Sequence, residues 1–345
     1  MKSVYSYLRW PMIFTGIGLA LAAYLGWQTT GTVAGLLSFL MIGTVLAALE
    51  ISLSFDNAIV NANRLKTMTP EWQHRFLTWG ILIAVFGMRI VFPLLVVVIA
   101  ANIGPWSAVV LAWSEPEEYA RIMDEAHLGI AAFGGTFLMM VALNYFIDHE
   151  KEVDWFRMLE CRLRACASIR GLEIALVLGI VLMFTIALPN REGATFLFAA
   201  VCGLLTFLGV ELLSHMLDRA DTSSGVAAGG LGAFLYLEVL DASFSFDGVI
   251  GAFALTQNLF LIAIGLGIGA LYVRSMTIML VERKTLAEFR YLEHGAFYSV
   301  LALSIIMFAQ SFWHVPEVIT GLIGACLIGL SLFASIRYNN RMVSE

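Results

Sequence analysis

Two stretches of the chain place acidic residues inside long apolar runs. The first stretch, LEISLSFDNAIVNA, spans residues 49–62, and the second, LEVLDASFSFDGVIGAF, spans residues 237–253. Together they contain five acids: Glu50, Asp56, Glu238, Asp241 and Asp247. An acid at the centre of a bilayer costs about 2.5–3.5 kcal/mol on insertion scales. Protonation, ion pairing or a bound cation must therefore offset the burial of five acids.

Every side chain that could bind an ion in these stretches offers oxygen. Apart from the acids, the candidates are the Asn57 amide and the hydroxyls of Ser52, Ser54, Ser243 and Ser245, and neither stretch contains His or Cys. An all-oxygen site favours Mn²⁺, Mg²⁺ or Ca²⁺ over Zn²⁺ or Cu⁺. Because there are more carboxylates than one ion needs, exchange of the ion for protons is a further hypothesis.

Helix geometry restricts how the first pair of acids can act together. On a straight helix, Glu50 and Asp56 would point about 120° apart and differ by about 9 Å in height. Either the helix unwinds near residues 52–54 or 243–245, where serines compete for backbone hydrogen bonds, or crossed helices each place one acid at their contact. Carbonyl groups freed by unwinding would be additional ligands.

The two stretches also resemble one another. They align on Ser-Phe-Asp, with a further acid six residues before each aligned aspartate. In the apolar run that follows each stretch, a glycine precedes an arginine by nine residues: Gly80 and Arg89, then Gly265 and Arg274. These matches indicate an internal duplication, and we expect the two arginines to pair with two of the acids.

Composition places the protein in a membrane. The chain is 60% hydrophobic and 13% charged, whereas soluble domains carry about 25% charged residues; nothing in its charge suggests nucleic acid. We predict an all-α, polytopic bundle of about ten spans. The predicted spans are 11–27, 33–61, 77–101, 127–147, 172–188, 194–213, 226–256, 259–280, 294–312 and 317–336. Residues 102–114 would form a re-entrant or interfacial piece, and the first run is a retained helix rather than a signal peptide.

The basic residues predict the orientation of these spans. With the N-terminus inside, sixteen of the twenty lysines and arginines fall in inner segments, and only Arg121 and Arg191 lie outside. This bias favours an even number of spans with both termini cytoplasmic. The acidic outer loop, 114–127, is then a solvated cap or a cation-attracting vestibule. The inner loop, 148–170, is predicted to form an amphipathic helix on the inner leaflet or to dock a cytoplasmic protein.

In this arrangement the acidic motifs lie on spans two and seven, which run in opposite directions. The chain would be a single membrane domain, 1–345, built from inverted halves, 11–188 (with the 148–170 loop) and 194–336. A smaller duplicated unit, spans 2–4 and 7–9, fits as well. Inverted repeats with a site near the midplane are common in secondary transporters.

The motifs resemble the signatures of the TerC-like integral membrane proteins, a family named for tellurium resistance. EISLSFDNAIV is similar to E-x-S-L-S-x-D-N, and EVLDASFSFDGVI is similar to E-x-x-D-x-x-F-x-x-D-S except that Gly248 replaces the last serine. The resemblance implies manganese export or related metal homeostasis at the bacterial inner membrane. The family's polar positions correspond to Glu50, Asp56, Asn57, Glu238, Asp241 and Asp247.

The leading interpretation is therefore a secondary transporter that exports a divalent cation, with Mn²⁺ favoured, without enzymatic activity or a permanent cofactor. One alternative is a membrane scaffold or insertion component that recruits partners through 148–170. The other is an intramembrane aspartyl protease using Asp56 and Asp247, although the Gly-x-Gly-Asp signature of such proteases is missing.

Overall fold

The computed structural model describes residues 4–148, 151, 153–165, 171–223, 230–313 and 315–344, and its regular structure is helical throughout this part of the chain. The predicted all-α class is therefore confirmed. The helices are α1 (Val4–Thr30), α2 (Val33–Leu53), α3 (Phe55–Leu65), α4 (Pro70–Leu82), the π-helix η1 (Ile83–Val91), α5 (Phe92–Ala100), α6 (Pro105–Ser114), α7 (Pro116–Ile147), α8 (Arg157–Ala165), α9 (Leu172–Ala187), α10 (Asn190–Ser223), α11 (Leu231–Leu255), α12 (Leu259–Glu282), α13 (Thr285–Glu288), α14 (Leu292–Ala309) and α15 (Glu317–Ser344).

Seven described helices are long and apolar enough to cross a membrane. They lie within α1, α2, α7, α10, α12, α14 and α15. An eighth span would be a bent pair, Phe86–Ala100 and Pro105–Ser114, whose axes differ in direction by 104°. The predicted re-entrant piece, 102–114, thus lies largely in α6, the second arm of this pair. The protein is a multi-pass membrane protein, and its apolar helices imply a lipid bilayer around it.

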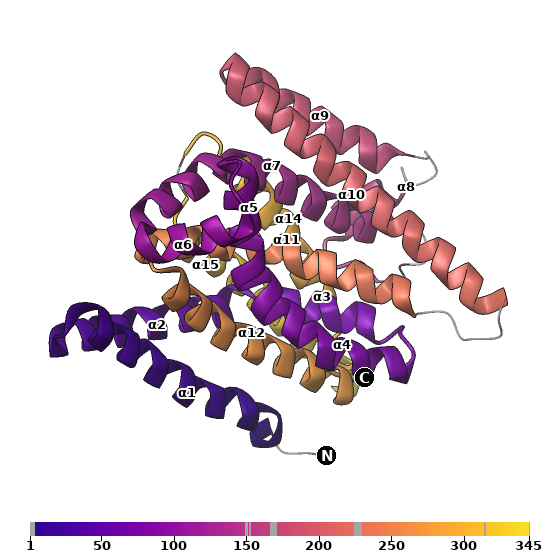
Figure 1. Ribbon diagram of the computed structural model, residues 1–345. Helices are drawn as coiled ribbons and strands as arrows, with labels where there is room; N and C mark the ends of the chain where they lie inside the picture. The colour runs from indigo at the N-terminus through magenta and orange to yellow at the C-terminus, as the bar shows by residue number, and fades with distance from the viewer. Residues whose placement is uncertain are drawn as a thin grey trace.

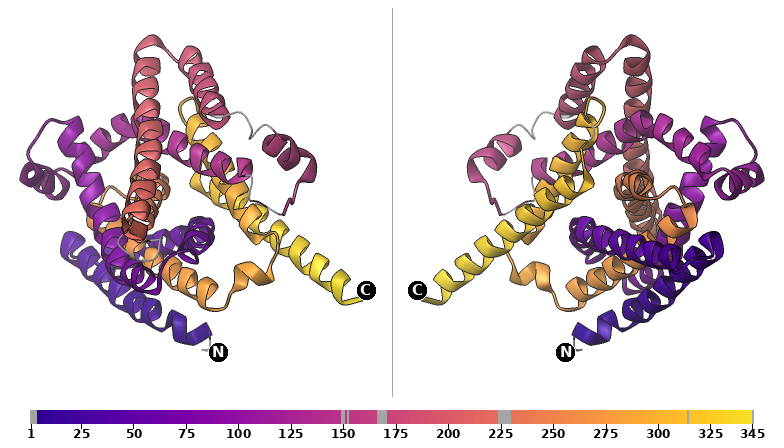
Figure 2. Two further views of the ribbon diagram at one scale, coloured as in Figure 1. Left: turned by 90° about the vertical axis from the view of Figure 1, so that its right-hand side faces the viewer. Right: turned by 90° about the vertical axis from the view of Figure 1, so that its left-hand side faces the viewer.

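The predicted count of ten spans is not shown. The run 33–61 divides at Ser54 into α2 and α3, and α9 has only 16 residues. Helix α11 carries three acids among its 25 residues. The count of ten, the inverted repeat and the cytoplasmic termini therefore stay predictions. Both termini lie low in the two views of Figure 2, whereas the turn between α9 and α10 is at the top.

The short helix α3 occupies the centre of the bundle. All of its residues from Asp56 to Ala62 are buried, and it contacts α11, α12, α14 and α15. Helices α1 and α2 pack together along α12, while α9 and α10 cover α7 on the other side (Figure 1). A polar helix segment is thus enclosed by apolar helices, and its side chains must find partners on them.

Candidate functional site

The first acidic motif is interrupted at Ser54. Its backbone angles, φ −99° and ψ 16°, differ from those of the flanking helices. The N–H of Ser54 still donates to the Glu50 carbonyl at 3.0 Å. Ser54 belongs to neither α2 nor α3, so the regular helix is interrupted at this residue. The last carbonyl groups of a helix have no partner within it, so those at the end of α2 are candidates for binding a ligand.

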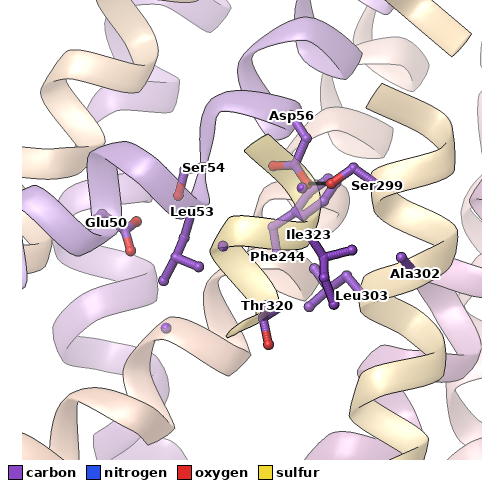
Figure 3. A pocket seen from close by; sticks show the side chains of 13 residues that line it. Glu50, Leu53, Ser54, Asp56, Phe244, Ser299, Ala302, Leu303, Thr320 and Ile323 are labelled. Carbon is purple, nitrogen blue, oxygen red and sulfur yellow. Dashed lines mark hydrogen bonds between the residues drawn. The ribbon is translucent and has the colours of Figure 1, made fainter. Parts of the chain in front are cut away.

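The interruption brings Glu50 and Asp56 to one cavity. The cavity has a volume of about 30 Å³, and its polar lining comes from Glu50, Ser54, Asp56, Ser299 and Thr320. Figure 3 shows Glu50 on the helix before the break and Asp56 on the helix after it. The space is sufficient for a water molecule or a single ion. Two acids that a straight helix would separate thus face the same space.

Asp56 is buried and held from two directions. Its Oδ2 accepts a hydrogen bond from Ser299 Oγ on α14 at 2.8 Å, drawn in Figure 3, and its Oδ1 accepts from the backbone N–H of Asn57 at 2.8 Å. Only 5% of the residue is exposed. These two donors fix the carboxylate at the cavity wall.

Glu50 pairs with an arginine on an unusual helix. Arg89 lies in η1, and its Nη2 donates a hydrogen bond to Glu50 Oε1, both side chains being buried. π-helical segments are rare and are frequent at functional sites. Gly269 on α12 permits the arrangement, because a Cβ there would lie 2.3 Å from Glu50 Cγ.

The opposite face of α3 meets the second acidic motif. Asn57 and Asn61, one turn apart, line a second cavity of about 20 Å³ together with Asp241, Arg89 and Arg274. The Asn61 amide donates to Asp241 Oδ1 at 2.6 Å. Helix α3 therefore separates two small polar cavities, and each contains side chains that the sequence singled out.

Around Glu238 the contacts are looser. Arg274 Nη2 lies 4.0 Å from Glu238 Oε1 and 3.9 Å from Asp241 Oδ2. Within the described residues, neither Glu238 oxygen has a hydrogen-bond partner. The Arg274 guanidinium lies 3.8 Å from the centre of the Phe76 ring. A Cβ at Gly80 would come within 2.5 Å of both Glu238 and Arg274, so this close packing requires glycine.

The second motif does not break. Helix α11 continues through Ser243 and Ser245. Ser243 Oγ donates to its own helix, to the Val239 carbonyl at 3.0 Å, and the buried Ser245 Oγ has no hydrogen-bond partner in the described chain. Asp247 lies on this helix, but its side chain is outside the described residues. Ser52, on α2, is exposed.

Among the predicted ligands, Glu50 and Asp56 line the first cavity, whereas Asn57 and Asp241 line the second. Among the described side chains, no three His, Cys, Asp or Glu residues are close enough together to hold a metal ion. A cation near Asp56 would need oxygen from hydroxyls, carbonyls or water as well as from the two acids.

Sequence reasoning missed four polar residues of these cavities: Asn61, Thr277, Ser299 and Thr320. Asn61 has a recognisable signal, since it follows Asn57 by four residues in an otherwise apolar stretch and so shares its face. Ser299 and Thr320 have none, because they lie far away in sequence on apolar helices. The Thr320 hydroxyl is buried and has no hydrogen-bond partner in the described chain.

Comparison with known proteins identifies the family. Residues 55–342 match the family described as "Protein of unknown function (DUF475)". The chain belongs to this family. The match begins at α3 and includes both motif aspartates, Asp56 and Asp247. No curated protein and no solved structure matches the chain. A link to the TerC-like proteins is not shown, so that resemblance remains limited to the motifs.

Proposed function

We propose that this protein is a secondary transporter that exports a hard divalent cation across the bacterial inner membrane. Mn²⁺ is the favoured cargo, with Mg²⁺ and Ca²⁺ as alternatives, and protons are the proposed coupling ion. The observation that carries the proposal is the break at Ser54, which gives Glu50 and Asp56 a common cavity deep in the bundle. Discontinuous helices with freed carbonyls are a recurrent way to bind cations in transporters.

The charge around α3 supports a divalent cargo. Four buried, described acids (Glu50, Asp56, Glu238 and Asp241) surround two arginines, Arg89 and Arg274. If all six are ionised, two negative charges remain, and a divalent cation would balance them. Unbalanced charge is costly in a low-dielectric interior. An empty carrier would instead take up protons, which is the physical reason for proposing exchange.

The donor set supports a hard ion. Carboxylates and hydroxyls are the polar side chains that line the cavity with Asp56, and no sulfur or imidazole is among its lining groups. Such donors suit Mn²⁺, Mg²⁺ and Ca²⁺. The preference for Mn²⁺ among these comes from the motif resemblance. The protease interpretation requires the Asp247 side chain, which the structure does not describe, so it stays an untested alternative.

Manganese efflux from proteoliposomes tests the proposal. We expect wild-type protein to release loaded Mn²⁺ with accompanying proton movement, and Asp56→Asn and Asp247→Asn to stop it. Glu173→Gln is the control, since Glu173 lies in the first turn of α9 and outside both cavities. Absence of Mn²⁺, Mg²⁺ and Ca²⁺ flux through correctly folded wild-type protein would refute the transport proposal.

A further inference from the structure

Residues 151 and 153–164, between α7 and α9, are anchored by a buried carboxylate. Glu160 on α8 is fully buried and accepts hydrogen bonds from Lys151 Nζ at 2.5 Å, Tyr298 OH at 2.9 Å and the Phe156 N–H at 3.0 Å. Burial alone would raise the pKa of the Glu160 carboxyl, but the hydrogen bonds from Lys151 and Phe156 outweigh it and lower this pKa. Glu160 is therefore an ionised anchor.

Further contacts hold the same segment against the bundle. His294 on α14 shares a hydrogen bond of 2.8 Å with the Val153 carbonyl, and Arg164 donates to both the Lys151 carbonyl and the Asp154 carboxylate. These bonds involve one side of α8 and the residues that precede the helix. They therefore determine which side of α8 faces outward.

The outward side of α8 is apolar and basic. Phe156 is 48% exposed, Met158 76% and Leu159 49%. Arg157 and Arg162 are also exposed, and no described acid forms an ion pair with either. Arg162 follows Met158 by four residues and Leu159 by three, so it adjoins them on the helix surface. We call these five residues the outer face of α8: Met158, Leu159 and Arg162 share one side of the helix, and Phe156 and Arg157 are exposed at its start.

The position of α8 identifies what covers this face. Helix α8 lies at the end of the bundle where α7 stops and α9 begins (Figure 1). Helix α9, the next described helix, also exposes apolar side chains, among them Leu176 and Leu182. Short helices with an apolar side and flanking arginines lie in the interface of a bilayer, and exposed arginines complement anionic headgroups.

We propose that the outer face of α8 is a lipid-binding surface: Phe156, Met158 and Leu159 enter the membrane interface, and Arg157 and Arg162 bind phosphate groups of anionic phospholipids. The Glu160 anchor holds the helix in the required orientation before lipid binds. This surface is separate from both cavities and does not depend on cation transport.

The depth of a nitroxide label in lipid nanodiscs tests the surface directly. The label is attached at Met158→Cys after replacement of the native cysteines by serine, with Glu71→Cys as a water-exposed control on α4. Nanodiscs contain phosphatidylcholine alone or mixed with phosphatidylglycerol. We expect the label at 158 to collide with oxygen more than with a water-soluble nickel chelate, most strongly with phosphatidylglycerol, and the label at 71 to show the reverse.

Tryptic cleavage of the otherwise unaltered chain provides a measurement that needs no label. Each basic residue at an anionic surface contributes about a fivefold preference, so cleavage after Arg157 and Arg162 should slow about 25-fold in phosphatidylglycerol nanodiscs. In the labelled protein, Arg157→Gln with Arg162→Gln should abolish the depth difference between the two lipids. Nickel accessibility at 158 equal to that at 71, or equal cleavage in both lipids, would overturn the proposal and leave the face free for a soluble protein.

Discussion

The first acidic motif is divided at Ser54 between α2 and α3, whereas the second lies within the continuous helix α11. In the first, Glu50 and Asp56 reach the same cavity. In the second, positions 241 and 247 lie on one unbroken helix, which separates two such positions by about 120° and about 9 Å. Residues that match in the two sequences thus lie in different backbone conformations.

This difference indicates different tasks for the two motifs. The divided motif brings two acids to one cavity, and we therefore assign the proposed ion site to it. In the continuous motif, Asp241 accepts a hydrogen bond from Asn61, and Glu238 lies near Arg274. This motif therefore supports α3 from the other side and supplies the additional negative charge.

The largest effect is expected from the arginines. Removing one member of a buried ion pair costs about 3–5 kcal/mol, so Arg89→Gln should lower the free energy of unfolding by about that amount. Arg274→Gln should cost less, since its guanidinium lies 3.9–4.0 Å from its acids rather than in a direct hydrogen bond. Thermal unfolding in detergent measures both. If stability recovers in the Arg89→Gln, Glu50→Gln double variant, the unpaired charge of Glu50 is the cause of the loss. An equal loss of stability in Arg89→Gln and Arg274→Gln would contradict the expected difference between the two motifs.

Cation affinity should distinguish the aspartates. A hydrogen bond or ligand contact involving a charge is worth about 1.5–3 kcal/mol, so Asp56→Asn should weaken Mn²⁺ binding by about 10–100-fold. Asp241→Asn should have a smaller effect because its carboxylate already accepts from Asn61. Titration of detergent-solubilised protein with Mn²⁺, followed by electron paramagnetic resonance, provides both affinities. A larger loss in Asp241→Asn would transfer the ion site to the continuous motif.

Two glycines test the packing around each motif. A Cβ at Gly269 would collide with Glu50, and one at Gly80 with Glu238 and Arg274. Overpacking costs about 1–3 kcal/mol, so Gly269→Ala and Gly80→Ala should both be destabilised. Gly329→Ala is the control, because a Cβ there meets nothing within 4 Å. It should be unchanged or slightly stabilised, as alanine favours a helix; the same result for Gly269→Ala would show that Glu50 can move aside.

The smallest effect concerns the serines. Ser299→Ala removes a hydroxyl donor from Asp56 and should weaken Mn²⁺ binding about tenfold. Ser243→Ala should leave binding unchanged, because that hydroxyl donates only to its own helix. The same titration compares them, and equal affinities of wild type and Ser299→Ala would exclude Ser299 from the ion site.

The sequence predicted the helical class and the unusual acids because both depend on local pattern. It could state that Glu50 and Asp56 need a break near residues 52–54 to act together, since this follows from helix periodicity. It could not decide between a break in one motif or in both, because both contain serines at the same positions. Whether the helix breaks depends on neighbours such as Gly269 and Ser299, which come close to the motif only when the chain folds.

The number of spans was less predictable for a related reason. Hydropathy detects an apolar run, but it does not show whether the run is straight. The chain turns by 104° between α5 and α6, and α2 ends in the middle of a run that reads as one helix. Likewise, Thr320 joins the cavity only because α15 packs against α2 and α3.

The central claim is that the break at Ser54 forms a cation site from Glu50 and Asp56. Anomalous scattering from crystals grown with Mn²⁺ tests it most directly. We predict a manganese peak in the cavity between α2, α3 and α14, with a carboxylate oxygen of Asp56 about 2.0–2.6 Å away. A peak only beside Asp241 or on the protein surface, or none at saturating Mn²⁺, would contradict the claim.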